Sequence, residues 1–216
     1  MRRSFKAEIL ECERITEAEA KRVYRDLTRI HRLFGDTALI IAAARRDPRP
    51  VTRILDVGCG GGGVLRDIRT RLGVDVVGVD LRPPAHVDVP FPIHRADATS
   101  DPLPIADIAF CMYLAHHLRE RDLIRLIRNV ARSCRRFILL DLVRHRLPLA
   151  LFRTVLAPFL SPIAVSDGAI SIRRSYTPPE LNRIAAIALA GTGAQFRHSI
   201  APLYIRQTLD ISYPRP

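Results

Sequence analysis

Several features that mark particular classes of protein are scarce in this sequence of 216 residues. Tryptophan is absent, and the four cysteines stand apart, with no CxxC pair or cysteine–histidine cluster. We therefore expect no metal site, and unpaired cysteines favour a reducing, cytoplasmic environment. The first residues, MRRSFKAEILECE, include acidic side chains and no apolar run, so we expect no secretory signal. The cysteines are Cys12, Cys59, Cys111 and Cys134.

A long uninterrupted hydrophobic run is also missing. The most apolar stretch, residues 147–165, contains Arg153 and the prolines at 148, 158 and 162. A membrane-spanning helix needs about 20 mostly apolar residues with few breaks. The sequence therefore predicts a soluble protein without a transmembrane segment.

Lysine is nearly absent from a strongly basic chain. Basic residues exceed acidic ones by 34 to 22, for a net charge of +12, yet lysine occurs only at positions 6 and 21. The charge is consistent either with anionic partners or with an arginine-rich compositional bias. Paired arginines, as at 135–136 and 173–174, are spread along the chain, and no RNA-binding module is evident. We therefore predict no nucleic-acid partner, and keep an RNA or protein substrate as the alternative.

The N-terminal part of the sequence predicts a helical cap. Thr16 and Glu19 form a capping box that begins a helix ending near residue 33, before Gly35. A second short helix is expected over 38–45. The sequence RRDPRP at 45–50 then breaks the chain, so we divide it into a cap, 1–50, and a core, 51–216.

From residue 51 onward, predicted strands and helices alternate. With 48% apolar residues, the chain can bury a sizeable core. Such alternation predicts a parallel sheet with helices on both faces, and ligands bind outside the carboxyl ends of its strands. The expected strands are 51–57, 74–79, 92–96, 105–112 and 137–142, and the expected helices are 64–72 and 118–133.

After residue 143 the alternation is interrupted. The proline-broken apolar stretch leads to Ser166-Asp-Gly168 and a short stretch over 169–174, which we interpret as a lid inserted over about 144–176. A capping box of Thr177 and Glu180 then begins a helix to residue 190. Strands over 195–200 and 203–209 form an antiparallel hairpin. The predicted fold is an α/β, doubly wound, Rossmann-like sheet of seven strands, mostly parallel with an antiparallel last strand.

The strongest motif is the glycine-rich loop LDVGCGGGG, residues 55–63, between a strand and a helix. Such a turn lets backbone N–H groups approach a ligand. Asp80, at the end of the second strand, is placed to hold a ribose diol. Asp56 would repel the pyrophosphate of a dinucleotide but attract the ammonium and sulfonium of S-adenosylmethionine. The sequence therefore favours S-adenosylmethionine, with NAD as the alternative.

LDVGCGGGG resembles motif I, and VVGVD motif II, of the seven-stranded S-adenosylmethionine-dependent methyltransferases. This resemblance covers about residues 51–145 and implies the fold and cofactor above. It also implies that the methionine moiety lies against the motif I loop and that Asp80 binds the ribose, with Leu81 packing on the adenine. Asp97 and the Ala98 backbone would bind the adenine ring. The implied loop residues are Asp56, Gly58, Cys59 and Gly60.

The fourth strand ends in LAHHL, which resembles the LHH of small-molecule methyltransferases, including quinone C-methyltransferases and natural-product O-methyltransferases. The [ND]PP[YF] motif of amine and nucleobase enzymes is missing. A histidine here suits general-base catalysis at neutral pH. We expect His116 or His117 to take the acceptor's proton, with Asp141 orienting the histidine. The alternative is that these residues only cap a helix or pack against the strand.

The segment YRDLTRIHRLFG, residues 24–35, resembles the RDLxRINRWxGG stretch of bacterial methyltransferases found beside type III polyketide synthases. His31 replaces the asparagine of that pattern and Leu33 its tryptophan. The stretch 147–165 offers an apolar wall for an aromatic acceptor, or packs the lid on the sheet. The expected acceptor-binding residues are Tyr24, His31, Phe34 and Tyr113.

Together these features predict a methyltransferase that acts on a small phenolic, polyketide or quinone-type acceptor, with O-methylation favoured over C-methylation. We expect a monomer or a homodimer. A binding module without catalytic activity, using the same cofactor pocket, is the remaining alternative.

Overall fold

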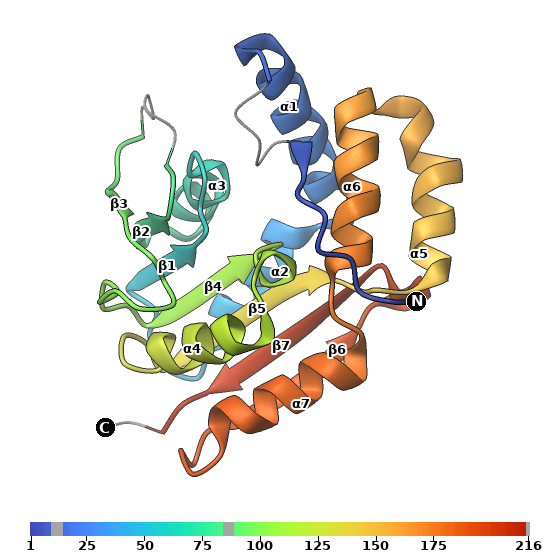
Figure 1. Cartoon of the computed structure of the whole chain (residues 1–216). Helices are drawn as coiled ribbons and strands as arrows, with labels where there is room; N and C mark the ends of the chain where they lie inside the picture. Colours follow the sequence, from blue (N-terminus) through green and yellow to red (C-terminus); the bar gives the residue numbers. More distant parts are fainter. Residues whose placement is uncertain (10–14, 84–88, 215–216) are drawn as a thin grey trace.

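Seven strands form one sheet in the order β3-β2-β1-β4-β5-β7-β6 (Figure 1). The computed structural model describes residues 1–9, 15–83 and 89–214. β7 runs antiparallel to both of its neighbours, and the other paired strands are parallel. The predicted Rossmann-like sheet with an antiparallel last strand is confirmed. The strands are β1 (Arg53–Val57), β2 (Asp75–Asp80), β3 (Ile93–Arg95), β4 (Ile108–Met112), β5 (Arg136–Leu142), β6 (Gln195–Ile200) and β7 (Arg206–Ser212).

Helices cover both faces of this sheet because side chains alternate between the two faces along each strand. Leu55 and Val77 belong to the core under α4 and α7, while Ile54 and Val76 belong to the core under α2 and α3. Each core is fully apolar at its centre, so the strands read as nearly continuous hydrophobic runs. These helices are α2 (Asp36–Arg45), α3 (Gly63–Leu72), α4 (Glu120–Val130) and α7 (Pro178–Leu189).

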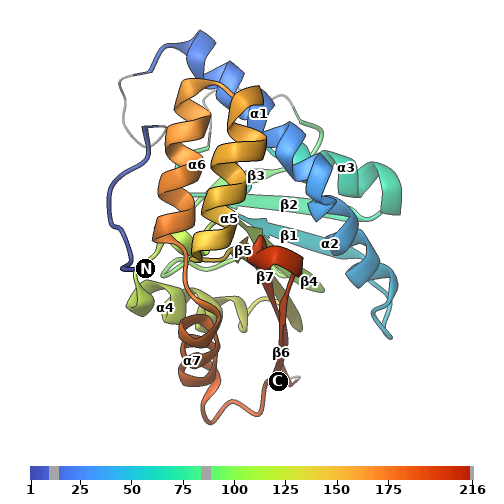
Figure 2. The same ribbon diagram turned by 90° about the vertical axis from the view of Figure 1, so that its right-hand side faces the viewer.

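The remaining helices stand over one edge of the sheet (Figures 1 and 2). They come from the two segments predicted as cap and lid, and α1 packs against α6. The extended N-terminal segment, residues 1–9, runs beside α6; we call it the N-terminal strap. These elements are α1 (Glu17–Phe34), α5 (Arg146–Leu151), the π-helix η3 (Phe152–Leu156), the 3-10 helix η4 (Ala157–Phe159) and α6 (Pro162–Arg174).

α6 begins before the short stretch, 169–174, that the sequence suggested after Ser166-Asp-Gly168. The helix continues through Gly168, which touches the ring of Phe152. A Cβ at this position would lie 2.4 Å from Cζ of Phe152, so the glycine permits close packing and does not end the helix. Pro162 occupies the first helical turn, where its missing N–H costs nothing.

Both predicted capping boxes are present. The hydroxyl of Thr16 accepts from the N–H of Glu19 at 3.3 Å, and the Glu19 carboxylate accepts from the N–H of Thr16 at 2.8 Å. Thr177 and Glu180 form the same arrangement before α7. Several boundaries shift: α2 begins at residue 36, β4 at 108, and β7 covers 206–212. None of the helices in the described ranges is long and apolar enough to cross a membrane.

Candidate active site

The glycine-rich loop follows β1 and leaves Asp56 buried, with only 4% of its surface exposed. Within the described residues, no hydrogen bond reaches the Asp56 carboxylate. Burial, and then the negative charge of Asp80, raise the pKa of Asp56 well above its usual value. A buried carboxylate without a donor is costly unless a ligand compensates it. A cationic group bound beside the loop would fit this environment.

The loop itself turns sharply at its glycines. Gly58 has a φ of 82°, and a Cβ there would lie 3.2 Å from the Leu114 side chain, so only glycine fits without displacement. Gly60 has a φ of 51° and donates its N–H to the Asp80 carboxylate at 2.8 Å. Cys59 packs its thiol against Gly78, and burial raises the pKa of that thiol, so Cys59 is neutral.

The ends of β2 and β3 lie beside this loop. Asp80 accepts from the N–H of Arg82 at 2.8 Å as well as from Gly60, and the neighbouring Leu81 is 57% exposed. Leu81 thus offers an apolar surface next to a carboxylate, the pairing that the adenine and ribose of a nucleoside require. The structure brings these predicted residues together at one edge.

Asp97 and Ala98 are held by local hydrogen bonds. Asp97 Oδ1 accepts from the N–H and the hydroxyl of Thr99, at 2.9 and 2.8 Å. The carbonyl of Ala98 accepts from the Asn129 side chain at 3.0 Å. Asn129, from α4, was not predicted from the sequence. It fixes the loop after β3 by donating also to the carbonyl of Asp101 at 2.7 Å.

The two histidines follow β4 in a 3-10 turn, η2 (Ala115–His117). His116 is 4% exposed, and its Nδ1 lies 2.7 Å from Oδ1 of Asp141. The backbone N–H of His116 also donates to Oδ2 of Asp141 at 2.7 Å. Asp141 lies near the end of β5, which neighbours β4 in the sheet. The expected histidine–aspartate pair is therefore formed, and it fixes the orientation of the His116 ring.

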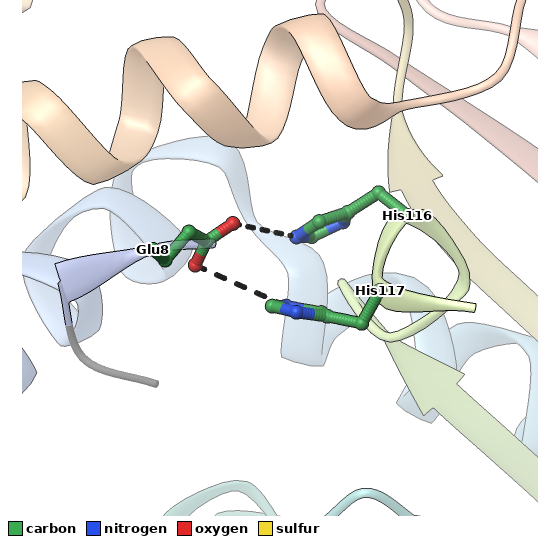
Figure 3. A group of neighbouring side chains, drawn as sticks. All are labelled: Glu8, His116 and His117. Atoms are coloured by element: carbon green, nitrogen blue, oxygen red, sulfur yellow. Dashed lines mark ion pairs between the residues drawn. The ribbon is translucent and has the colours of Figure 1, made fainter. Parts of the chain in front are cut away.

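Glu8 is a site residue that the sequence analysis missed. The N-terminal strap brings its carboxylate to 3.5 Å from His116 Nε2 and 4.0 Å from His117 Nε2 (Figure 3). The strap has no periodic pattern, and a glutamate more than 100 residues away in sequence carries no signal of this contact. Only the packing of the strap against α6 brings it to the histidines.

His116 is thus flanked by two carboxylates. Burial alone would lower the pKa of His116, but Asp141, and then Glu8, raise it to about 9. Burial would raise the pKa of Glu8, yet the nearby His116 and His117 rings and the hydrogen bond from Ser171 lower it. At neutral pH the free site therefore holds a protonated His116, whereas the sequence alone suggested a histidine near its ordinary pKa of about 6.5.

Tyr113, also predicted to contact the acceptor, has an unusual backbone with a φ of 57°. Its hydroxyl donates to Oδ2 of Asp36 at 2.7 Å, and Asp36 is fully buried beside Arg206. Burial, and then the charge of Asp36, raise the pKa of Tyr113 well above its usual value, so Tyr113 stays neutral. This chain of contacts joins the α1–α2 junction to β4 and β7 and sets the position of Phe34 nearby.

A cavity of about 200 Å³ connects these groups to the lid. Its polar end contains Glu8, Tyr113, His116 and His117. Asp167 and Ser171 of α6 also line the cavity. Most of the remaining wall is apolar and comes from α1, α5, η3 and α6, with Val23, Ile30, Phe34, Pro148, Phe152, Leu156, Ala164 and Ile172. The expected contact of Phe34 with the acceptor pocket is consistent with this lining. The side chains of Tyr24 and His31 lie outside the part of the chain that the structure describes.

The same polar end contains a possible set of metal ligands. Ligand atoms of Glu8, His116 and His117 lie within 4.8 Å of one another. Glu8, however, also accepts from the hydroxyl of Ser171 at 2.6 Å and lies 3.8 Å from Arg174. These contacts and the protonated state of His116 compete with a cation, because a metal needs a neutral histidine and an available carboxylate. The arrangement matches an ion-pair network better than a metal centre.

Comparison with known proteins agrees with this architecture. A family model described as "Methyltransferase domain" matches residues 20–160. No curated protein matched the chain. The plantazolicin methyltransferase BpumL, solved in complex with SAH, is 14% identical with a TM-score of 0.70, covering 92% of this chain and 91% of its own.

Two further solved structures share the fold. Human N-acetylserotonin methyltransferase, in complex with SAM, is 13% identical with a TM-score of 0.61, covering 91% of this chain and 57% of its own. The pyocyanin biosynthetic protein PhzM is 14% identical with a TM-score of 0.57, covering 81% and 54%. The match of the family model over most of the chain, together with the seven-stranded topology, shows that the chain belongs to the methyltransferase domain family and is a class I S-adenosylmethionine-dependent methyltransferase.

Proposed function

We propose that this enzyme methylates the hydroxyl group of a small aromatic acceptor, of a phenolic, polyketide or quinol type. The observation that carries the proposal is the position of the His116–Asp141 pair at the polar end of a cavity whose wall is mostly apolar. An apolar wall suits a flat or alkylated ring, and a histidine at the end of the cavity suits the one group on it that must lose a proton.

We infer that the loop after β1 and the ends of β2 and β3 bind the cofactor. Asp56 would face the cationic end of S-adenosylmethionine, Gly58, Cys59 and Gly60 would contribute backbone, and Asp80 would accept from the ribose hydroxyls. Leu81 would pack on the adenine, with Asp97 and Ala98 at its edge. When bound, the cofactor supplies an electrophilic methyl group on a sulfonium. The residues fit because a buried carboxylate without a donor favours a cation.

His116 would act at the acceptor. In its neutral form, Nδ1–H donates to Asp141 and Nε2 is left to receive the hydroxyl proton. Asp141 keeps this tautomer in place and stabilises the imidazolium that results. His117 and Tyr113, which line the same cavity, would contact the ring of the acceptor, and the apolar lid would exclude water from the reacting atoms.

The solved structures that share this fold support the proposed class of substrate. The names of the solved structures above refer to plantazolicin, N-acetylserotonin and pyocyanin biosynthesis, and each is a small molecule or a small peptide product. An RNA or protein substrate is less well supported. Several arginines are used inside the fold, as in the ion pairs of Arg136 with Asp210 and of Arg206 with Asp36.

The test is methyl transfer to a panel of phenols, quinols and naphthols, with formation of S-adenosylhomocysteine as the readout. The proposal predicts aromatic methyl ethers as products. RNA and a histone-type peptide serve as comparison substrates. Transfer to either of these, with no ether from the aromatic panel, would contradict the proposed substrate class.

A further inference from the structure

Several hydrogen bonds hold the N-terminal strap against the acceptor cavity. The N–H of Ser4 donates to the carbonyl of Arg173 at 3.0 Å, and the N–H of Ile9 donates to the Asp167 carboxylate at 2.7 Å. Arg3 donates to the carbonyls of Arg174 and Leu118, at 2.6 and 2.9 Å. These bonds join the strap to α6 and to the turn after β4, the two elements that bound the polar end of the cavity.

This anchoring buries Glu8 and directs it at the histidines. Glu8 is 7% exposed, and α6 holds its carboxylate through Ser171 at 2.6 Å and Arg174 at 3.8 Å. The side of the carboxylate away from α6 faces both histidine rings (Figure 3). Because Ser171 and Arg174 hold its carboxylate, Glu8 has a defined position in the site, unlike an exposed side chain on the surface.

The distance between the Glu8 carboxylate and the His116 ring suits an atom that bridges them. Their nearest atoms are 3.5 Å apart, longer than a normal hydrogen bond between a nitrogen and an oxygen. An oxygen atom beside this gap can lie about 2.8 Å from both atoms. A hydroxyl both donates and accepts, so it can donate to a carboxylate and accept from a protonated ring nitrogen at once. A reacting carbon atom can do neither.

We propose that Glu8 and His116 together form the subsite for the reacting hydroxyl of the acceptor. This inference rests on the proposed function and adds a residue and a reacting atom to it. While His116 is protonated, the hydroxyl would accept from Nε2–H and donate to Glu8. Once His116 is neutral, the hydroxyl would turn its single proton to Nε2, and Glu8 would stabilise the positive charge that His116 gains. The subsite therefore selects oxygen over carbon as the methylated atom.

The chemistry balances with the groups named. An oxygen–methyl bond forms, and the sulfur–methyl bond of S-adenosylmethionine breaks, leaving the neutral thioether S-adenosylhomocysteine. The hydroxyl proton passes to Nε2 of neutral His116, which becomes an imidazolium between Asp141 and Glu8. His116 later releases this proton to solvent. Glu8 thus helps to form the imidazolium, but it also raises the pH at which free His116 becomes neutral.

All charged groups around His116 enter this pH dependence. Asp141 faces Nδ1 from β5, Glu8 faces Nε2 from the strap, and the His117 ring lies 4.1 Å from the His116 ring between centroids. Arg174 approaches Glu8 from α6, and the Arg3 guanidinium donates to the carbonyl of His116 at 3.4 Å. Asp167, on α6, lines the same cavity and accepts from the N–H of Ile9. Glu8 is the negative group that faces Nε2, so removing Glu8 lowers the pKa of His116.

The first experiment needs no acceptor. The histidine rings of the full-length protein are labelled with ¹⁵N and titrated by NMR, and the His116 signals are assigned from their loss in His116→Gln. In Glu8→Gln we expect the pKa of His116 to fall by about one unit or more, since an opposite charge within 4–6 Å shifts a pKa by about 1–3 units. Lys6→Met, on the same strap but exposed and away from the histidines, is the matched control and keeps the wild-type value.

A pKa in Glu8→Gln within a few tenths of the wild-type value would overturn the proposal. Glu8→Ala provides a second variant, because it removes the carboxylate without leaving a buried amide. If both Glu8 variants fail to fold while Lys6→Met folds, the role of Glu8 is structural and the proposal is also overturned.

The second experiment measures kcat/KM against pH for a phenol that the enzyme methylates. We expect the pH at which the rate stops rising to move down by about one unit or more in Glu8→Gln and to stay in Lys6→Met. We also expect a larger fall of kcat in Glu8→Ala than in Glu8→Asp, which keeps the charge. An unmoved pH profile, or methyl transfer to carbon, would contradict the subsite. If the titration shifts but no phenol is methylated, the proposed function fails while the coupling of Glu8 to His116 stands.

Discussion

The two ends of the site differ in how the chain builds them. At the cofactor end, all of the candidate residues come from one stretch, 56–98, and follow consecutive strands. At the acceptor end, Glu8, His116, Asp141 and Ser171 come from four separate segments. The cofactor end depends on local turns that a sequence specifies directly, whereas the acceptor end depends on packing between the strap, the sheet and the lid.

The two buried aspartates show the same contrast. Asp141 accepts from the ring and the backbone of His116 and from the N–H of Leu142, so its charge is balanced within the protein. Asp56 receives no hydrogen bond within the described ranges, and its pKa is raised. One carboxylate therefore serves the fold and a neighbouring side chain, while the other is the one that we propose binds the cofactor.

The largest effect is expected at the acceptor end. Replacing His116 with alanine removes the proposed base, and general-base catalysis contributes about 10²–10⁴ in rate. We expect kcat to fall by at least a hundredfold, measured as S-adenosylhomocysteine release. Calorimetric titration with S-adenosylhomocysteine should give the same Kd as in the wild type. If His116→Ala lost affinity for S-adenosylhomocysteine as well as rate, the acceptor end and the cofactor end would not act independently.

The converse change is Asp56→Asn at the cofactor end. It keeps the shape but removes the charge, and a hydrogen bond to a charged group is worth about 1.5–3 kcal/mol. We expect the Kd for S-adenosylmethionine to rise about 10- to 100-fold. The Tm of the free variant should not fall, because a buried charge without a donor has been removed. A lower Tm with unchanged Kd would show that Asp56 stabilises the fold and does not bind the cofactor.

A smaller effect is expected in the lid. Gly168→Ala places a methyl group against the ring of Phe152 inside the helix contact. Overpacking of this kind costs about 1–3 kcal/mol, which lowers the Tm of a protein of this size by several degrees. Phe152→Leu should restore most of the loss in the double variant. Additive losses in the double variant would show that the two side chains do not meet.

The last prediction is a pH dependence of stability. The folded-state pKa of His116 is raised to about 9, above an unfolded value of about 6.5. The stabilisation from its ion pairs is therefore complete below about pH 6.5 and is lost as the pH rises through about 9. Thermal unfolding of wild type and His116→Gln across this range should show a steeper loss in the wild type. Parallel curves would contradict the ion pairing.

Much of the fold and the cofactor end could be predicted from the sequence. Capping boxes, strand–helix alternation and the LDVGCGGGG loop all depend on neighbours in the chain, so they leave local patterns. Gly168 shows the limit of such patterns. A glycine often ends a helix, but Gly168 lies inside α6, where its missing side chain leaves room for the ring of Phe152. Glu8 shows it again, since its role depends on a contact with residues more than 100 positions away. The raised pKa of His116 comes first from Asp141 and then from Glu8, and the sequence predicted only the first of these partners.

The most direct test of the account is the product formed from an alkylphenol that has a free hydroxyl and free ring carbons. Wild type and His116→Ala are incubated with it and labelled S-adenosylmethionine near pH 9, and the products are identified by mass spectrometry and NMR. The account predicts a methyl ether from the wild type, formed at least a hundredfold more slowly by the variant. No ether from any phenol of the panel, a methyl group on carbon, or equal rates for the two proteins would contradict it.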